Sequence, residues 1–106
     1  MNYVKDYLAE EPTRAQIDSA PGVTLLEFGA PDCGFCAAVQ PALASALDTE
    51  DSISHIKVED GSGRALGRTF GVKLWPTFVL IRDGAEVGRV VRPGHTREIR
   101  ELIAQR

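Results

Sequence analysis

The sequence has little cysteine, little aromatic character and no long apolar run. Two of its 106 residues are cysteine, 7% are aromatic, and tryptophan and methionine occur once each. Uninterrupted apolar stretches are short, with five residues from Phe35 to Val39 and four from Phe78 to Ile81, whereas a helix needs roughly 20 apolar residues to cross a bilayer. Two cysteines are also too few for the several cross-links of a disulfide-rich secreted scaffold. These scarcities argue against a membrane-spanning helix and against a disulfide scaffold.

A strong excess of one charge sign is also missing. Twelve Lys and Arg residues and fifteen Asp and Glu residues give a formal net charge of −3, spread along the chain. A surface for nucleic acid or anionic membrane usually appears in the sequence as a basic stripe, and none is visible. We therefore expect neither nucleic acid nor a membrane as a partner.

The length fits a single domain. A chain of 106 residues lies near the commonest domain size and buries enough surface to fold without cross-links. No internal repeat or linker divides it, so we predict one domain over residues 1–106. The stretch from Met1 to Tyr7 carries charges where a signal peptide has its apolar segment. The expected location is therefore the cytoplasm.

The spacing of apolar residues predicts alternating strands and helices. Val23 to Gly29 is almost continuously apolar, which is typical of a strand buried on both faces. Apolar residues recur at helical spacing from Cys33 to about Leu47, and Pro41 is expected to kink that helix. The other predicted elements are short helices at 13–20 and 62–70, a strand at 53–59, hairpin strands at 77–82 and 86–91, and a helix capped by Thr96. This order predicts an α/β fold in which helices pack on a mixed sheet.

Both cysteines stand at the start of a predicted helix, in the motif Cys33-Gly34-Phe35-Cys36. Three residues apart on the first turn, the two thiols are close enough to form a disulfide with each other. Unpaired amides at a helix N-terminus also stabilise a thiolate. A zinc site needs four ligands, and the remaining candidates, His55 and His95, lack a paired spacing. The motif therefore favours a metal-free redox pair over a zinc site or two inert buried cysteines.

Together with other segments, this motif resembles the thioredoxin family over nearly the whole chain. The resemblance rests on Leu26-Glu27-Phe28 before the cysteines, on Gly71-Val72 before Trp75-Pro76-Thr77-Phe78, and on Asp83-Gly84 and Gly94 at family-like intervals. It implies the thioredoxin fold, with a central mixed sheet of four to five strands and helices on both faces. It also implies thiol:disulfide oxidoreductase activity that needs no bound cofactor.

The resemblance implies separate roles for the residues of the site. Cys33 is expected to attack a substrate disulfide, and Cys36 to attack the resulting mixed disulfide and release the reduced substrate. Pro76 resembles a cis-proline that packs against the disulfide. Glu27, an acid within an apolar strand, and Lys57 fall where the family has a buried acid, usually aspartate, and a lysine. The acid is implied to help deprotonate Cys36, and the alternative is a Glu27 that faces solvent.

Several residues around the cysteines depart from the family pattern. Gly29 and Asp32 stand where the family has tryptophans, and Asp32 is expected to cap the helix, to disfavour a thiolate on Cys33, or both. Phe35 replaces the proline of reducing thioredoxins, so we expect a more oxidising pair. Trp75 replaces a smaller residue and is either core or part of an apolar substrate groove. The residues expected to bind substrate are Asp32, Gly34, Phe35, Trp75, Pro76, Pro93 and Gly94.

The expected partners are disulfide-containing proteins as substrates and a thioredoxin reductase-like electron donor, with the chain acting as a monomer. Three alternatives stay open. A glutaredoxin-like protein would use glutathione, although Gly-Gly followed by an acid is missing near the second hairpin strand. Phe35 leaves an isomerase-like role open. A thioredoxin-fold adaptor would bind a partner without turnover, and the intact cysteine pair argues against it.

Overall fold

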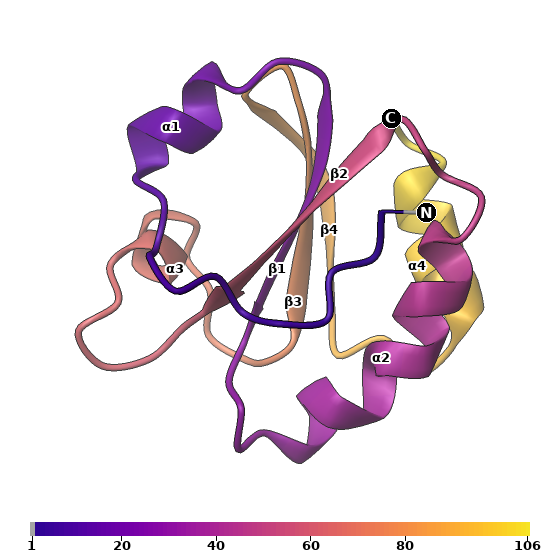
Figure 1. Cartoon of the computed structure of the whole chain (residues 1–106), viewed down its shortest axis with the longest axis horizontal. Helices are drawn as coiled ribbons and strands as arrows, with labels where there is room; N and C mark the ends of the chain where they lie inside the picture. The colour runs from indigo at the N-terminus through magenta and orange to yellow at the C-terminus, as the bar shows by residue number, and fades with distance from the viewer. Residues whose placement is uncertain (1) are drawn as a thin grey trace.

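Strands and helices alternate along the chain as the apolar spacing predicts (Figure 1). The computed structural model describes residues 2–106. The strands are β1 (Val23–Gly29), β2 (Ile53–Glu59), β3 (Thr77–Arg82) and β4 (Ala85–Val91). The helices are α1 (Arg14–Ser19), α2 (Gly34–Leu47), α3 (Leu66–Thr69) and α4 (Thr96–Ile103). Helix α2 continues through Pro41.

The four strands form one mixed sheet in the order β2-β1-β3-β4. Strand β1 pairs in parallel with β2 and antiparallel with β3, and β3 pairs antiparallel with β4. In this register Glu27 lies opposite Lys57 on one side and Phe78 on the other. Because β1 has strands on both sides and helices over both faces, its sequence is almost continuously apolar.

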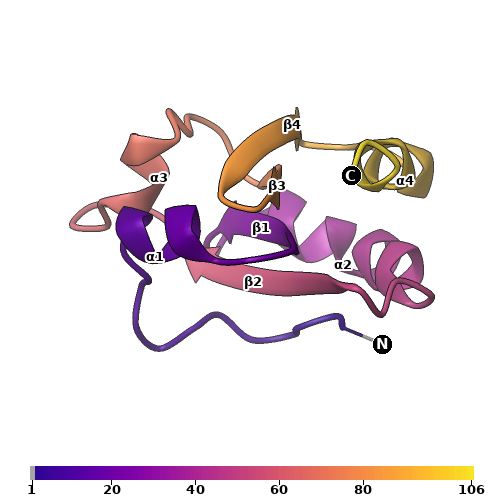
Figure 2. The same ribbon diagram turned by 90° about the horizontal axis from the view of Figure 1, so that it is seen from above.

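Helices cover both faces of the sheet, with α2 and α4 on one side and α1 and α3 on the other (Figure 2). The core under α2 and α4 consists of Leu25, Val39, Leu43, Ala46, Leu47, Ile53, Phe78, Leu80, Ile99, Leu102 and Ile103. The core under α1 and α3 consists of Ile17, Leu26, Phe28, Val58, Leu66, Phe70, Val79 and Ile81. Successive residues of a strand point to opposite faces, so Glu27 shares the face of Leu25, beneath α2.

Some predicted boundaries are wrong. Thr96 is the first residue of α4 rather than its cap, and the N-cap residue His95 makes no side-chain capping bond. Helix α3 is shorter than the predicted 62–70, because Gly63 before it has a φ of +79°, outside the helical region. Strand β4 begins one residue early, at Ala85. A two-residue turn suffices there, since Asp83 and Gly84 both have positive φ (48° and 85°).

Residues 2–8, which we call the N-terminal segment, run beside β2 without forming a strand. One backbone bond joins them to the strand, from the N–H of Leu8 to the carbonyl of Lys57 at 2.9 Å. Further hydrogen bonds use side chains: the N–H of Val4 donates to His55 Nδ1 at 2.8 Å, Lys57 Nζ donates to the carbonyl of Lys5 at 2.8 Å, and Asn2 Nδ2 donates to the carbonyl of Ile53 at 2.6 Å. The described sheet therefore has four strands rather than five.

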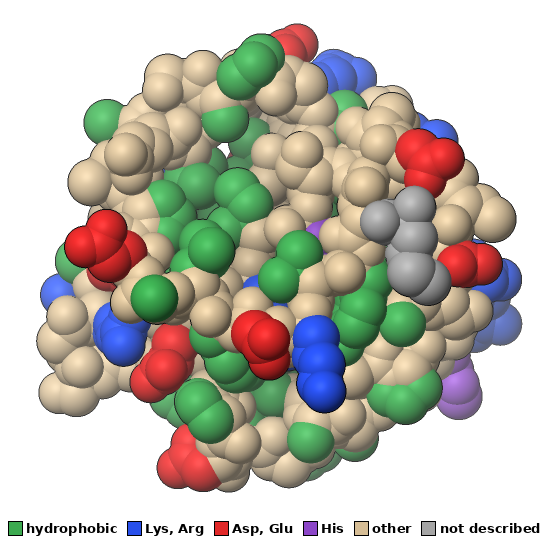
Figure 3. Space-filling model, viewed as in Figure 1, with side chains coloured by type: hydrophobic (Ala, Val, Ile, Leu, Met, Phe, Trp, Pro, Cys, Tyr) green, Lys and Arg blue, Asp and Glu red, His purple; other side chains and the backbone are tan. Residues whose placement is uncertain are grey.

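Acidic and basic side chains are scattered over the face seen in Figure 3 and do not gather into a patch of one sign. This distribution agrees with a formal net charge of −3 from nearly balanced charges. Within residues 2–106 the helices are all too short or too polar to cross a bilayer.

Candidate active site

Cys33 ends the loop after β1 and caps helix α2. Its backbone is extended (φ −96°, ψ 115°), and its sulfur accepts the backbone N–H of Cys36 at 3.2 Å. A sulfur that receives a helix N-terminal amide is stabilised as a thiolate. The prediction that Asp32 caps this helix is wrong, because Cys33 occupies the N-cap position. Asp32 is exposed beside it.

The two thiols are free and differ in their surroundings. Cys33 is half-buried, whereas Cys36 is 2% exposed. Burial raises the pKa of the Cys36 thiol to about 12, with a further contribution from its hydrogen bond to Cys33. At neutral pH Cys36 is therefore a protonated thiol, and Cys33 is the sulfur that another molecule can reach.

Glu27 is fully buried beneath α2 and accepts hydrogen bonds on both carboxylate oxygens. Gln40 Nε2 donates to Oε2 at 2.9 Å, and His55 Nε2 lies 2.8 Å from Oε1. His55 Nδ1 already accepts the N–H of Val4 at 2.8 Å, so the ring proton sits on Nε2 and points at Glu27. The expectation of a buried, partnered acid is met, and a solvent-facing Glu27 is excluded.

Lys57 lies opposite Glu27 in the sheet, but its amine turns away from the carboxylate. It donates to the carbonyl of Lys5 at 2.8 Å and to Gln40 Oε1 at 3.2 Å. Among the described residues no ion pair within 4.0 Å joins Lys57 to Glu27, whose partner on β2 is the His55 imidazole. Gln40 instead connects the two, and its Nε2 also donates to the carbonyl of Cys36 at 2.8 Å.

An apolar groove of about 250 Å³ lies beside the motif, next to the exposed ring of Phe35. The Trp75–Pro76 peptide bond at its edge is cis, as the resemblance implies. Of the residues predicted to bind substrate, Phe35, Pro76, Pro93 and Gly94 line this groove together with Ala38, Val39, Ala42 and Arg92. The groove thus brings together α2, the cis-proline just before β3 and the segment after β4.

The other predicted substrate-binding residues lie outside this lining. The Trp75 indole is half-buried and donates to Asp60 Oδ2 at 2.9 Å, so it is tied to the loop after β2. Asp32 and Gly34 are exposed at the start of α2. Arg92, which the sequence analysis did not single out, contacts two of the predicted binding residues. Its guanidinium lies 4.4 Å from the Phe35 ring centroid, and its Nε donates to the Trp75 carbonyl at 2.8 Å.

Sequence reasoning missed four residues of the site: Tyr7, Gln40, His55 and Arg92. Two of them carried a usable signal. Gln40 stands four residues after Cys36, which is helical spacing, and His55 stands two before Lys57, on the same face of β2. Tyr7 and Arg92 reach the site from distant segments, and no spacing in the sequence predicts that.

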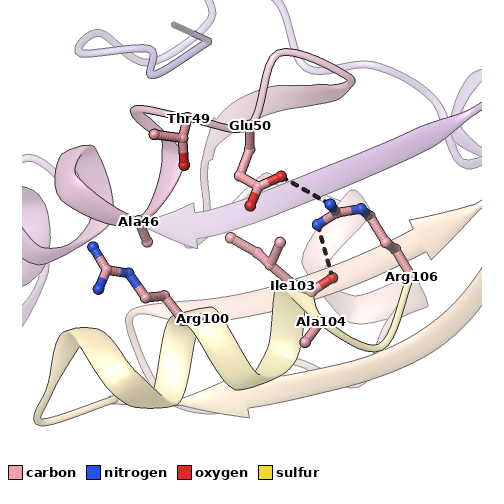
Figure 4. Close-up of a pocket in the computed structure, with 7 residues that line it drawn as sticks. All are labelled: Ala46, Thr49, Glu50, Arg100, Ile103, Ala104 and Arg106. Carbon is pink, nitrogen blue, oxygen red and sulfur yellow. Dashed lines mark hydrogen bonds and ion pairs between the residues drawn. The ribbon is translucent and has the colours of Figure 1, made fainter.

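A larger hollow, of about 470 Å³, lies between the C-terminal parts of α2 and α4 (Figure 4). Its described lining residues include an ion pair between Glu50 and Arg106 at 3.0 Å and no cysteine. A 14-residue helix is about 20 Å long, so this hollow and the cysteines lie at opposite ends of α2. The reactive site is therefore identified by its chemistry and not by cavity volume.

Comparisons with known proteins match this geometry. The family model for thioredoxin matches residues 5–105. Thioredoxin Asp f 28 of Aspergillus fumigatus is 27% identical over 97% of this chain and 95% of its own length. Thioredoxin of Chlamydia caviae is 38% identical over 68% of this chain and 71% of its own. The structure of reduced thioredoxin 2 from Pseudomonas aeruginosa PAO1 superposes with a TM-score of 0.84 and 50% identity, over 96% of this chain and 98% of that one.

Proposed function

The chain belongs to the thioredoxin family and is a thiol:disulfide oxidoreductase with a Cys-x-x-Cys active site, and we propose that it reduces or exchanges protein disulfides through Cys33 and Cys36. One observation carries this proposal: an accessible Cys33 sulfur accepts a helix amide, while the Cys36 thiol behind it is buried and protonated. We assign the activity to a single domain over residues 1–106.

The proposed reaction has two exchange steps. The Cys33 thiolate attacks one sulfur of the substrate disulfide, forms a mixed disulfide and displaces the other substrate sulfur as a thiolate. Cys36 then loses its proton and attacks the Cys33 sulfur. That attack forms the Cys33–Cys36 disulfide and displaces the second substrate thiolate. Two electrons pass from the dithiol to the substrate, and a reductase restores the dithiol.

We propose that Glu27 receives the proton of Cys36 in the second step. It is the one buried carboxylate among the described residues, and it lies beneath the helix that carries Cys36. Among the described residues no hydrogen bond joins Glu27 to the Cys36 sulfur, and Gln40 Nε2 donates to both Glu27 Oε2 and the Cys36 carbonyl. Lys57 supports this arrangement indirectly by donating to Gln40 Oε1. The charge of Glu27 acts on Cys36 through space, so we assign Glu27 to resolution rather than to the first attack.

We propose that an extended segment of the substrate lies in the groove beside Phe35. Pro76, Pro93 and Gly94 form its far wall and offer backbone and apolar surface to such a segment. Trp75 contributes backbone next to Pro76, whereas Asp32 and Gly34 border the entrance at the start of α2. A bound segment would then hold its disulfide at the Cys33 sulfur.

Thioredoxin-family proteins act on disulfide substrates and draw electrons from thioredoxin reductase-like donors. We propose the same two partner classes for this chain, acting as a monomer without nucleic acid or membrane. We also propose a cytoplasmic location, since that compartment keeps thiols reduced.

Reduction of insulin disulfides by the wild type, Cys33→Ser and Cys36→Ser tests the proposal. The wild type should be active with dithiothreitol as donor, Cys33→Ser inactive, and Cys36→Ser trapped as a mixed disulfide that mass spectrometry detects. A wild type without activity would favour a binding adaptor. Activity that requires glutathione would favour a glutaredoxin-like protein, and efficient refolding of scrambled disulfides would favour an isomerase-like role.

A further inference from the structure

Gly29, the last residue of β1, leaves open space directly beside the buried sulfur of Cys36. A Cβ added to Gly29 would stand 2.8 Å from Cys36 Sγ and 2.9 Å from the hydroxyl oxygen of Tyr7. The Cys36 sulfur and the Tyr7 hydroxyl oxygen thus both border the small space beside Gly29, and the side chain of an alanine at position 29 would overlap both atoms. The family resemblance places a tryptophan at this position, and here the tyrosine hydroxyl comes to the sulfur instead.

Tyr7 reaches this volume from the N-terminal segment and is fixed there by Lys57. The Lys57 amine lies 4.7 Å from the centroid of the Tyr7 ring, and the N–H of Leu8 donates to the Lys57 carbonyl at 2.9 Å. Burial, followed by the neighbouring Cys36, raises the pKa of Tyr7 well above its usual range. The hydroxyl therefore keeps its proton and faces the sulfur as a donor.

Tyr7 approaches Cys36 from the side of α2 that faces away from the substrate groove. A pocket of about 180 Å³ opens there, lined by Tyr7, Ala30, Pro31, Cys36, Ala37, Gln40 and Lys57. The groove uses Ala38, Val39 and Ala42, which lie on the opposite face of the helix. A substrate bound in the groove therefore leaves the contact between Tyr7 and Cys36 intact.

We propose that Tyr7 is a catalytic residue of the resolving step, in which its hydroxyl donates a hydrogen bond to the Cys36 thiolate as that sulfur attacks the mixed disulfide. The inference rests on the proposed function, in which Cys36 resolves. The Cys36 proton leaves toward Glu27, the S–S bond to Cys33 forms as the substrate sulfur departs, and Tyr7 keeps its own proton throughout.

The surroundings of Cys36 explain why such a donor matters. The backbone N–H of Cys36 is directed to Cys33 Sγ and is not available to its own sulfur. Glu27 is itself an acceptor of hydrogen bonds from Gln40 and His55, so it provides no donor for the Cys36 sulfur. Against the larger effect of burial, the backbone of Ala30 lowers the pKa of Cys36 through a hydrogen bond, and the Tyr7 hydroxyl, whose own pKa is raised by burial and by its hydrogen bond with Cys36, is a further donor beside the sulfur. Hydrogen bonds to a charged sulfur are stronger than those to a neutral thiol.

Single-turnover kinetics of the reduced Tyr7→Phe variant test this proposal. An aromatic disulfide that releases a coloured thiolate gives one product in the attack of Cys33 and a second in the attack of Cys36. We expect an unchanged first phase. The second phase should slow about tenfold, the effect of losing one hydrogen bond to a charged group. The pH midpoint of the second phase should also move upward, which a packing role alone would not produce.

Two further variants keep the test decisive. Leu8→Ala changes an exposed side chain of the same segment, 44% accessible, and should leave both phases unchanged. Ring-fluorinated tyrosine placed only at position 7, in a Tyr3→Phe background, keeps the shape and strengthens the donor, so the second phase should reach its midpoint at lower pH than in the background protein. A second phase insensitive to both Tyr7 changes, or equal slowing of both phases, would overturn the proposal. Loss of the first phase in the wild type would instead refute the proposed function.

Discussion

Glu27 and His55 form a fully buried pair, in which Glu27 Oε1 lies 2.8 Å from His55 Nε2 and both side chains are 0% exposed. The pair joins β1 to β2 beneath α2. His55 Nδ1 also accepts the N–H of Val4, so the imidazole links the N-terminal segment to Glu27 through two hydrogen bonds. A buried carboxylate is costly unless donors surround it, and here His55 and Gln40 provide them.

Replacing Glu27 separates the two steps of the reaction. In Glu27→Ala we expect attack by Cys33 at nearly the wild-type rate and slower release of the mixed disulfide, because the proposed proton acceptor is gone. Stopped-flow measurement of both phases checks this, with Glu86→Ala as an exposed acidic control on β4. Release at the wild-type rate would remove Glu27 from the mechanism.

His55→Ala should destabilise the fold. It leaves the buried Glu27 carboxylate with one donor fewer and the N–H of Val4 without its acceptor, at a cost of about 3 kcal/mol. Urea unfolding measures the change in the free energy of unfolding. His95→Ala is the matched control, because His95 is exposed and makes no capping bond, and its effect should stay within about 0.5 kcal/mol. Equal effects in the two variants would contradict this account of the pair.

Alkylation should distinguish the two thiols. Because burial raises the pKa of Cys36 to about 12, it stays neutral at pH 7 to 9, and iodoacetamide should modify Cys33 alone. In Cys33→Ser, where burial still acts, Cys36 should remain unmodified over the same pH range. Mass spectrometry of peptides reads out both results. Since the folded-state pKa is raised, the neutral thiol favours folding below its unfolded pKa, and this stability is lost as the pH rises toward 12.

Phe35 should matter more for protein substrates than for small ones. Its ring is 60% exposed at the edge of the groove, where an extended substrate would cover it. Phe35→Ala is therefore expected to raise KM for insulin severalfold, the effect of losing one aromatic contact, with little change for a small aromatic disulfide. Leu8→Ala, which removes another exposed apolar side chain, should leave both KM values unchanged. A parallel loss for both substrates would instead place Phe35 in the chemistry of the thiols.

Phe35, one of the two residues between the cysteines, should also influence the redox potential. We expect a reduction potential above that of a Gly-Pro thioredoxin, and Phe35→Pro should lower it by about 30 mV, equivalent to about 1.4 kcal/mol. Equilibration with a glutathione buffer of known ratio measures both proteins. A wild-type value at or below that of a Gly-Pro thioredoxin would contradict the expectation of a more oxidising pair.

The predictions that the structure confirms rest on local patterns of apolar residues in the sequence. Strands β1 and β2 and helix α2 begin and end close to where apolar spacing predicts, because burial on one or both faces leaves a period of two residues or of about 3.6. Asp32 shows the limit of local rules. Aspartate is a favoured N-cap, but the loop after β1 delivers Cys33 to that position, and the sulfur accepts the amide.

The sequence by itself determined the family, the order of strands and helices, and the reactive pair Cys33 and Cys36, since each follows from short motifs and from their spacing along the chain. Only the tertiary structure decided what surrounds that pair. It placed Tyr7 against Cys36, connected Glu27 to Lys57 through Gln40, and laid Arg92 over Phe35. These contacts join segments far apart in the sequence, and their geometry depends on strand register and on packing across layers, which no local pattern records.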